Sequence, residues 1–447
     1  MLYNSSVSKI YESGRTISIA SLAVPKFFEM VFVQMLGTVN TIMLSGYSEE
    51  AVAATSVANQ IQNLSVVILN IIICGMSILM SIELGKNDIS KAGQVAGTAY
   101  ISILIASAIV GAIISVFSEK LVCLMNLEGE AQAIAADYLG IKSRFLFILM
   151  STSYFNNLLI CNGYAKYTFV TGITSNILNV AYGYIVLYSG LNLPVDKINA
   201  LAYSLPITQT IVLVIAVIIY KKNSCPFNLR YNPNLLKKIL RVGTPSGLGS
   251  LSFTATQVLT TGFMATLGVS VLNAKVYVSN IISYTSKISW SVAQGHSVLT
   301  GRYRGKGEYD KMNILYRQNM AIAVLSNTVL SVLVFILYKP LIGIFTDDLS
   351  VIALAAAVMS VDIIVEIARA VNNIAEQSLN ANGDVKTTFI VPLFTCWIFG
   401  VLLAYILGIR CGLGLVGCWI GFAVDEVVKA TLYSLRWKSG KWKNTNV

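Results

Sequence analysis

The stretch GMSILMSIELGK, residues 75–86, is matched 220 residues further along the chain by GHSVLTGRYRGK, residues 295–306. Both stretches follow the pattern G-x-S-x-L, then five residues, then G-K. The same shift places NGYAKYTF, residues 162–169, on NGDVKTTF, residues 382–389. Two compact patterns that recur at one ungapped offset indicate an internal duplication. The chain therefore predicts two halves with the same fold.

Each half reads as a set of membrane-spanning helices. Of the 447 residues, 55% are hydrophobic and only 12% are charged, whereas a soluble domain carries about 25% charged residues. Apolar runs long enough to cross a hydrocarbon core of ~30 Å recur along the chain. These features predict an all-α polytopic membrane protein with twelve spans: 16–44, 50–84, 92–118, 131–161, 166–190, 198–221, 241–267, 271–301, 316–345, 351–381, 387–409 and 414–436.

The longest basic polar stretch separates the sixth span from the seventh. We therefore predict an N-lobe over residues 1–222, a cytoplasmic linker over 223–240 and a C-lobe over 241–447. The 220-residue shift also aligns Pro25 with Pro245 at the start of the first helix of each lobe. Because six is an even number, both lobes have the same orientation, and we expect a pseudo-twofold axis along the membrane normal.

The distribution of positive charge predicts the orientation. The net charge of +11 could suggest a nucleic-acid partner. The distribution of Lys and Arg between the two sides of the membrane explains it better, because cytoplasmic loops of membrane proteins are rich in these residues. We expect both termini in the cytoplasm, the inner membrane as location, the lipid bilayer as partner and no nucleic acid. The opposite loops hold few basic residues: Lys120, Lys197, Lys275, Lys339 and Arg410.

The C-lobe carries polar stripes inside its spans. In the tenth span, spacings of three and four place six polar residues on one helical face, and we expect this stripe to line a wet cleft. The alternative is that Glu366 and Arg369 pair within one turn and only pin the helix. A milder stripe follows the eighth span. The two stripes are Asp362, Glu366, Arg369, Asn373, Glu376 and Asn380, and Asn280, Tyr284, Lys287, Ser291 and Gln294.

The N-lobe is rich in amides and poor in deep carboxylates. Lys26 and Glu29 are three residues apart and can neutralise each other, while Glu29 and Asn40 share a helical face. In the twelfth span, Asp425, Glu426 and Lys429 have the spacing of an internal salt bridge. The amides of the N-lobe spans are Asn40, Asn59, Asn63, Asn156, Asn157, Asn176 and Asn179.

Several function classes are excluded by what the sequence lacks. It holds a single histidine, His296, and its seven cysteines form no C-x-x-C pair, so we expect no metal site. It has no nucleotide-binding loop and no nucleophile constellation, so we expect neither an enzyme nor a cofactor. Transport, if the chain performs it, must run on an ion gradient or downhill.

Four segments resemble the multidrug and toxic compound extrusion (MATE) transporters, in particular a bacterial branch. They are LAVPKFFEMVFVQMLGTVNTIMLSGYSEEAVAATSVANQI (22–61), SVAQGHSVLTGRYRGKGEYD (291–310), EIARAVNNIAEQSLNANGDVK (366–386) and GLGLVGCWIGFAVDEVVKATLYSLRWKSGKW (412–442). The likeness extends from Ile17 to Trp442. It implies a monomeric twelve-helix antiporter that alternates between outward- and inward-facing states and exchanges amphipathic, drug-like compounds for protons or sodium.

The chain departs from this family at its ion sites. Asn40 stands where many members carry a titratable aspartate, and Gly183 stands where its partner aspartate would be. Phe253 lies about where some members use a glutamate, with Gln257 as the nearest polar residue, and Arg369 replaces another aspartate. An amide cannot lose a proton at physiological pH. We therefore predict ion coupling in the C-lobe, with these candidates: Glu366, Glu376, Asp362 and Glu29.

The substrate class stays open at this point. Aromatic rings near the cleft could stack on flat or cationic compounds, while Lys287 and Arg369 admit zwitterions or anions. Two alternatives are a flippase for a lipid-linked precursor and a non-transporting receptor on the same scaffold. The candidates for the substrate cleft are Asn40, Asn59, Asn156, Asn176, Asn179, Gln257, Tyr277, Asn280, Tyr284, Lys287, Arg369 and Asn373.

Overall fold

The computed structural model describes residues 9–12, 15–45, 49–125, 129–188, 196–223 and 225–445. Most of them are helical. Two short strands near the N-terminus, β1 (Lys9–Glu12) and β2 (Arg15–Ser18), pair antiparallel, with Lys9 opposite Ser18. This hairpin was not predicted from the sequence.

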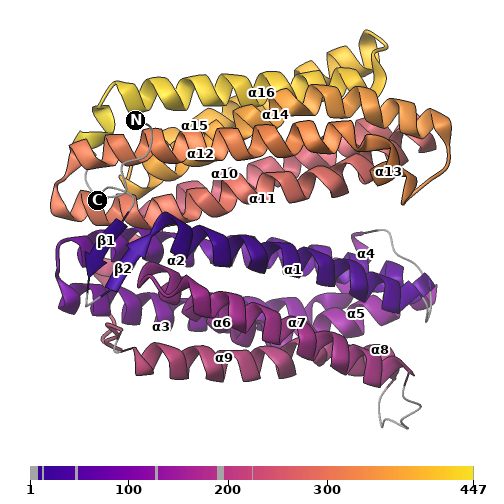
Figure 1. Cartoon of the computed structure of the whole chain (residues 1–447). Helices are drawn as coiled ribbons and strands as arrows, with labels where there is room; N and C mark the ends of the chain where they lie inside the picture. The colour runs from indigo at the N-terminus through magenta and orange to yellow at the C-terminus, as the bar shows by residue number, and fades with distance from the viewer. Residues whose placement is uncertain are drawn as a thin grey trace. The chain divides into compact units, whose positions relative to one another are not determined.

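The chain folds into two compact units. The N-terminal unit comprises Pro25–Glu83 and Asp88–Gly243, and the C-terminal unit comprises Met1–Val24, Leu84–Asn87 and Thr244–Val447. Two of the boundaries fall inside helices, just before Pro25 and Pro245, the two prolines that the duplication aligns. Within each unit the long helices run side by side (Figure 1).

The first nine helices cover the first half of the chain. Seven of the described helices, or pairs of adjoining helices, are each long and apolar enough to cross a bilayer. The fourth predicted span is divided at Phe145 and the sixth at Tyr203. The helices are α1 (Ile19–Ser45), α2 (Glu49–Gly85), α3 (Ile89–Val116), α4 (Ser118–Cys123), α5 (Gly129–Arg144), α6 (Leu146–Cys161), α7 (Ala165–Tyr188), α8 (Lys197–Ala202) and α9 (Ser204–Lys222).

The second half repeats this order with fewer breaks. Helix α14 spans the residues that the 220-residue shift assigns to α5 and α6 together. Helix α15 contains Pro392 and continues into π-helical turns, in keeping with the backbone donor that proline lacks. The elements are α10 (Pro233–Ala265), α11 (Val269–Lys306), α12 (Tyr309–Ile336), α13 (Tyr338–Gly343), α14 (Leu349–Ala381), α15 (Val385–Thr395), η1 (Cys396–Leu403), η2 (Ile406–Arg410), α16 (Gly414–Lys438) and η3 (Lys441–Asn444).

The repeated glycines allow close helix packing. A Cβ on Gly75 would collide with the carbonyl oxygen of Ile239 at the start of α10, and one on Gly295 would lie 3.1 Å from the Cβ of Leu22 at the start of α1. The 220-residue shift relates these two glycines. The start of each lobe's first helix thus packs against an equivalent glycine, as small residues permit.

The segment between the lobes is ordered over residues 225–232 and lies along α3. The amide of Asn228 donates to the carbonyl of Gly93 over 3.0 Å, and Thr98 Oγ1 donates to the carbonyl of Arg230 over 3.2 Å. Gly97 permits this approach, because a Cβ there would overlap the carbonyl oxygen of Asn228. Residues 223–240 therefore include a packed stretch without regular secondary structure and the first turns of α10.

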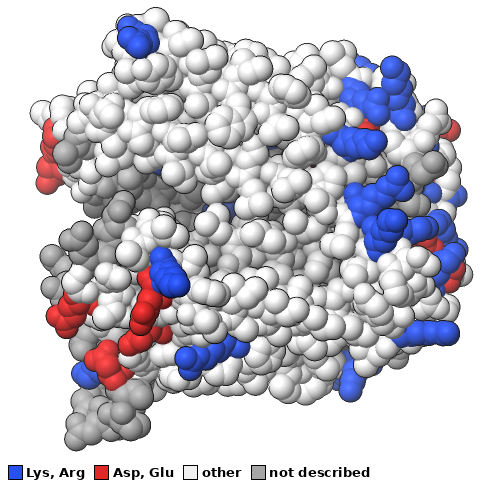
Figure 2. Space-filling model, turned by 180° about the vertical axis from the view of Figure 1, so that it is seen from behind, with Lys and Arg blue, Asp and Glu red and all other residues white. Residues whose placement is uncertain are grey.

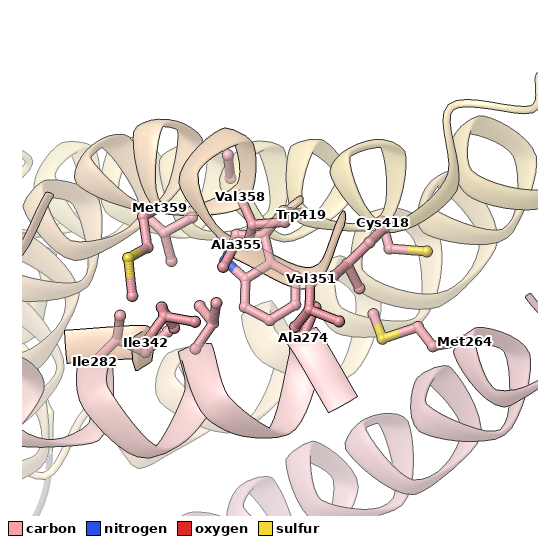
Figure 3. Close-up of a cluster of buried hydrophobic side chains, with 14 of the residues drawn as sticks. Met264, Ala274, Ile282, Ile342, Val351, Ala355, Val358, Met359, Cys418 and Trp419 are labelled. Carbon is pink, nitrogen blue, oxygen red and sulfur yellow. The ribbon is translucent and has the colours of Figure 1, made fainter. Parts of the chain in front are cut away.

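The core of the C-terminal unit surrounds Trp419 of α16. Its indole ring lies among aliphatic and methionine side chains from α10, α11, α13 and α14 (Figure 3). These side chains include Met264, Ala274, Ile342, Val351 and Met359, all almost inaccessible. The indole nitrogen of Trp419 donates a hydrogen bond to a polar residue of the site described next.

On the face that Figure 2 shows, few charged side chains lie along the middle of the helices. Figure 2 shows largely uncharged helix faces, with Lys and Arg gathered at one end of the helices. This pattern is typical of proteins whose long helices cross a bilayer.

Candidate functional site

The N-terminal unit encloses a cavity of about 470 Å³, which we call the N-terminal cavity. Helices α1, α2 and α5 to α9 supply its walls. Five residues that the sequence analysis singled out lie in its lining: Glu29, Asn59, Asn156, Asn176 and Asn179. The side chain of Asn40 lies outside the described residues.

Amides and hydroxyls form most of the polar lining. Asn179 Nδ2 donates to Ser204 Oγ over 3.2 Å, and Thr171 Oγ1 donates to Asn156 Oδ1 over 3.0 Å. Asn176 Nδ2 is buried and has no hydrogen-bond partner among the described residues. Gly183 also faces the cavity, and a Cβ there would lie 3.2 Å from Met43 Cε. A side chain at this position, where the family resemblance expects an aspartate, would therefore crowd Met43 and Leu201.

Glu29 is fully engaged by its neighbours. Its Oε1 lies 2.8 Å from Lys26 Nζ, and its Oε2 accepts from Thr168 Oγ1 over 2.9 Å. The charge of this carboxylate is therefore compensated inside the unit.

Lys142 is the charged residue of the cavity that sequence reasoning missed. It lies near the end of α5, well inside the fourth span, and only 6% of it is exposed. Its ammonium donates to Asn59 Oδ1 over 2.7 Å and lies 5.0 Å from the ring centre of Tyr138. No carboxylate of the described residues forms an ion pair with it. The duplication offered a signal, because Lys142 precedes Asp362 by 220 residues.

The C-terminal unit contains an acidic cluster, made of Asp362, Glu366, Arg369, Asp425, Glu426 and Lys429. Glu366 is fully buried, and its Oε1 pairs with Arg369 Nη1. Its Oε2 accepts from Asn327 Nδ2 of α12 over 3.0 Å. The interpretation of Glu366 and Arg369 as a pair within one turn thus matches the geometry, but a residue of a second helix, α12, completes the arrangement.

The second half of the cluster lies on α16. Lys429 Nζ lies 3.1 Å from Asp425 Oδ2 and 3.2 Å from Glu426 Oε1. Glu426 Oε2 also accepts from Asn372 Nδ2 over 2.6 Å, and its Oε1 lies 3.9 Å from Arg369 Nε. Glu426 therefore connects the two cations.

Asp362 and Glu376 extend the cluster along α14. Asp362 Oδ1 accepts from Trp419 Nε1 over 3.0 Å, so the indole of the core reaches the polar stripe. Glu376 lies close enough to Lys429 and Glu426 to interact with both charges. Counting Asp362, the cluster holds four carboxylates and two cations, and Glu376 adds a fifth carboxylate nearby.

The expectation of a solvated stripe is wrong for most of α14. Asp362, Glu366, Asn373 and Asn380 are each less than a tenth exposed. Asn373 Nδ2 donates to Ser289 Oγ over 2.9 Å, for example. The period of the stripe was read correctly, but α11, α12 and α16 cover it and supply polar partners.

The remaining candidates of the C-terminal unit lie mainly on α11. Lys287 Nζ donates to the carbonyl of Ser283 over 3.2 Å and lies over the ring of Tyr284, and Asn280 is exposed. Tyr277 stacks on Phe345 with ring centres 5.0 Å apart, which is a packing role. Gln257 of α10 is half-buried.

The two sites have different chemistry. The acidic cluster can take up a proton or a cation, whereas the N-terminal cavity offers hydrogen-bond donors and one lysine. In the described ranges, no group of three His, Cys, Asp or Glu side chains could hold a metal ion.

Comparison with known proteins supplies the relatives of this chain. The MatE family model matches residues 25–185 and 245–406. The two matches begin at the aligned prolines, which confirms the duplication. The uncharacterized transporter YisQ of Bacillus subtilis is 33% identical over 443 residues, covering 96% of both chains. The probable multidrug resistance protein NorM of Thermotoga maritima is 22% identical over 95% of this chain and 93% of its own.

Solved structures show the same fold. An outward-facing multidrug resistance MATE family transporter has a TM-score of 0.88 at 20% identity, with 96% of both chains covered. A MOP superfamily transporter from Pyrococcus furiosus, whose binding pocket is described as reversed in polarity, has a TM-score of 0.87 at 20% identity over 96% of both chains. The twelve-span, two-lobe fold predicted from the sequence is thereby confirmed.

Proposed function

This chain belongs to the MatE family of membrane transporters, and from that premise we propose that it is an antiporter. It exports small amphipathic compounds in exchange for protons or sodium by alternating access. Relatives named as multidrug resistance proteins support this substrate class. The family consists of transporters and not of enzymes.

We propose that the acidic cluster couples export to the ion gradient. Four carboxylates and two cations leave a net negative charge when all are ionised, and Glu376 increases it. A net charge inside a membrane protein is costly unless a proton or another cation binds to it. The excess of buried carboxylates in the C-terminal unit is the observation that carries this assignment.

The N-terminal cavity supports the same division. Its one carboxylate, Glu29, is already paired with Lys26. Asn40 and Gly183 occupy the positions where the family resemblance expects ionisable groups, and neither residue can titrate. We therefore expect the coupling ion to bind in the C-terminal unit.

The setting follows from the family and from the charge pattern. We propose that the chain lies in the inner membrane as a monomer, with both termini in the cytoplasm. The end of the helices where Lys and Arg gather (Figure 2) would face the cytoplasm. We propose that transport requires a coupling ion and neither a cofactor nor a nucleic-acid partner.

Dye efflux from proteoliposomes tests the proposal. Imposed proton or sodium gradients should drive the wild type to export cationic ethidium, anionic dansylglycine or both, and E366Q combined with E376Q should abolish the gradient dependence. E308Q is the matched control, because Glu308 forms an exposed pair with Lys311 outside the cluster. Full gradient-driven efflux by the double variant would exclude coupling through these carboxylates.

A further inference from the structure

We propose that Lys142 makes the N-terminal cavity a binding site for an anionic group, so that the exported compounds include amphipathic carboxylates. This inference rests on the proposed function and names the substrate class that the cavity takes. It concerns the charge that the cavity recognises.

The first argument is the charge balance of the cavity. Both oxygens of Glu29 are engaged by Lys26 and Thr168. Among the described residues, the polar partners of the Lys142 ammonium are a neutral amide oxygen and a tyrosine ring. The lining therefore carries one uncompensated positive charge at a depth where an unpaired charge is unfavourable. An anion in the cavity would remove this penalty.

The second argument is the supply of donors. An ammonium has three N–H donors, and Asn59 accepts from one of them. Asn176 Nδ2 is a further buried donor in the same lining without a partner among the described residues. Carboxylate oxygens accept hydrogen bonds and donate none, so they complement both groups. A cationic compound would satisfy neither.

The third argument contrasts Lys142 with its counterpart in the duplication. The position 220 residues later is Asp362, in the acidic cluster. The cations of that cluster, half-buried Arg369 and buried Lys429, each contact carboxylates of their own unit. Lys142 lacks such a partner in the described part of the chain, which leaves its charge for a ligand.

The size and walls of the cavity suit a small amphipathic molecule. Its volume of about 470 Å³ is within the ~300–1,000 Å³ of ligand pockets. Val33, Leu149 and Leu205 add apolar surface beside the polar groups. A compound with a carboxylate and an aromatic body would use both.

A matched pair of probes tests this inference on the purified full-length protein. Dansylglycine carries a carboxylate, and dansylglycinamide is its neutral analogue. The wild type should bind dansylglycine at least about tenfold more tightly, as expected for hydrogen bonds to a charged group. K142M should reduce the preference to below about twofold. K166M, which changes an exposed lysine of α7, should keep the full preference.

The outcomes separate this inference from the proposed function. Equal affinity of the wild type for both probes, binding of neither, or an undiminished preference in K142M would overturn the inference. The wild-type comparison needs no variant to fold. Gradient-driven efflux of either dye without a carboxylate preference in binding would overturn only the inference, whereas absence of gradient-driven efflux of both ethidium and dansylglycine would overturn the proposed function.

Discussion

Replacing Lys429 by methionine should destabilise the C-terminal unit strongly. Lys429 is 6% exposed, and its ammonium lies 3.1 Å from Asp425 and 3.2 Å from Glu426. Methionine keeps the length of the side chain but leaves two buried carboxylates without this cation. Removing one partner of a buried ion pair costs about 3–5 kcal/mol, because the remaining charge is uncompensated.

An exposed lysine with the same spacing provides the control. Lys311 Nζ lies 2.9 Å from Glu308 Oε2, also three residues apart, but these side chains are 51% and 36% exposed. Water solvates both groups when the pair is broken, so K311M should change the free energy of unfolding by less than about 1 kcal/mol. The two lysines differ in burial and in the number of carboxylates that they contact.

Equilibrium unfolding by SDS in mixed micelles, followed by tryptophan fluorescence, measures both changes. Adding E426Q to K429M should restore part of the lost stability, because it removes one unpaired negative charge. Lowering the pH should do the same by protonating Asp425 and Glu426. If K429M were as stable as K311M, the reasoning that the cluster depends on internal charge compensation would be refuted.

Two further predictions concern packing and titration in the N-terminal unit. G97A should destabilise by about 1–3 kcal/mol, since its Cβ would overlap the carbonyl oxygen of Asn228. G262A, where the added Cβ meets nothing within 4 Å, should be neutral or stabilise by about 0.5–1 kcal/mol; thermal unfolding in detergent distinguishes the two. N40D should add a pH dependence to dye efflux, because a carboxylic acid titrates and an amide does not. An unchanged pH profile would show that this position only packs.

The architecture was largely predictable because it follows from length, hydropathy and repetition. The 220-residue shift predicted two equivalent halves, and apolar runs predicted six spans in each. The break at Phe145 was not predictable, because no proline marks it, whereas Pro206 in the first turn of α9 could have indicated the break at Tyr203. The pairing of β1 with β2 was missed because the formation of short strands depends on cross-strand contacts, which the local sequence pattern does not reveal.

The sequence predicted which polar residues share one face of a helix, but not which residues of other helices contact them. Spacing placed Asp362, Glu366 and Arg369 on one face of α14, where the structure has them. The partners that bury this face, Asn327 and Trp419, come from other helices, so a one-dimensional period could not reveal them. Whether a polar stripe faces water or protein depends on such neighbours, and this is why the expected solvation was wrong.

The duplication allows the charges of the two lobes to be compared position by position. Three acidic positions of α14, Asp362, Glu366 and Glu376, correspond by the 220-residue shift to Lys142, Leu146 and Asn156. One half has kept or gained carboxylates at positions where the other has a cation, an apolar residue and an amide. In the proposed antiporter, sites of opposite charge would bind opposite charges, so the ion and the substrate would not compete for the same groups.

This separation has a thermodynamic consequence. Because the lining of the N-terminal cavity and the acidic cluster share no residue, single changes in each should have additive effects on stability, as expected for sites without common partners. Their effects on gradient-driven export should not be additive, because both sites bias the same alternating-access equilibrium. The K142M and E366Q variants and their combination therefore separate binding from coupling: additive unfolding free energies together with non-additive efflux identify two sites that communicate only through the conformational change.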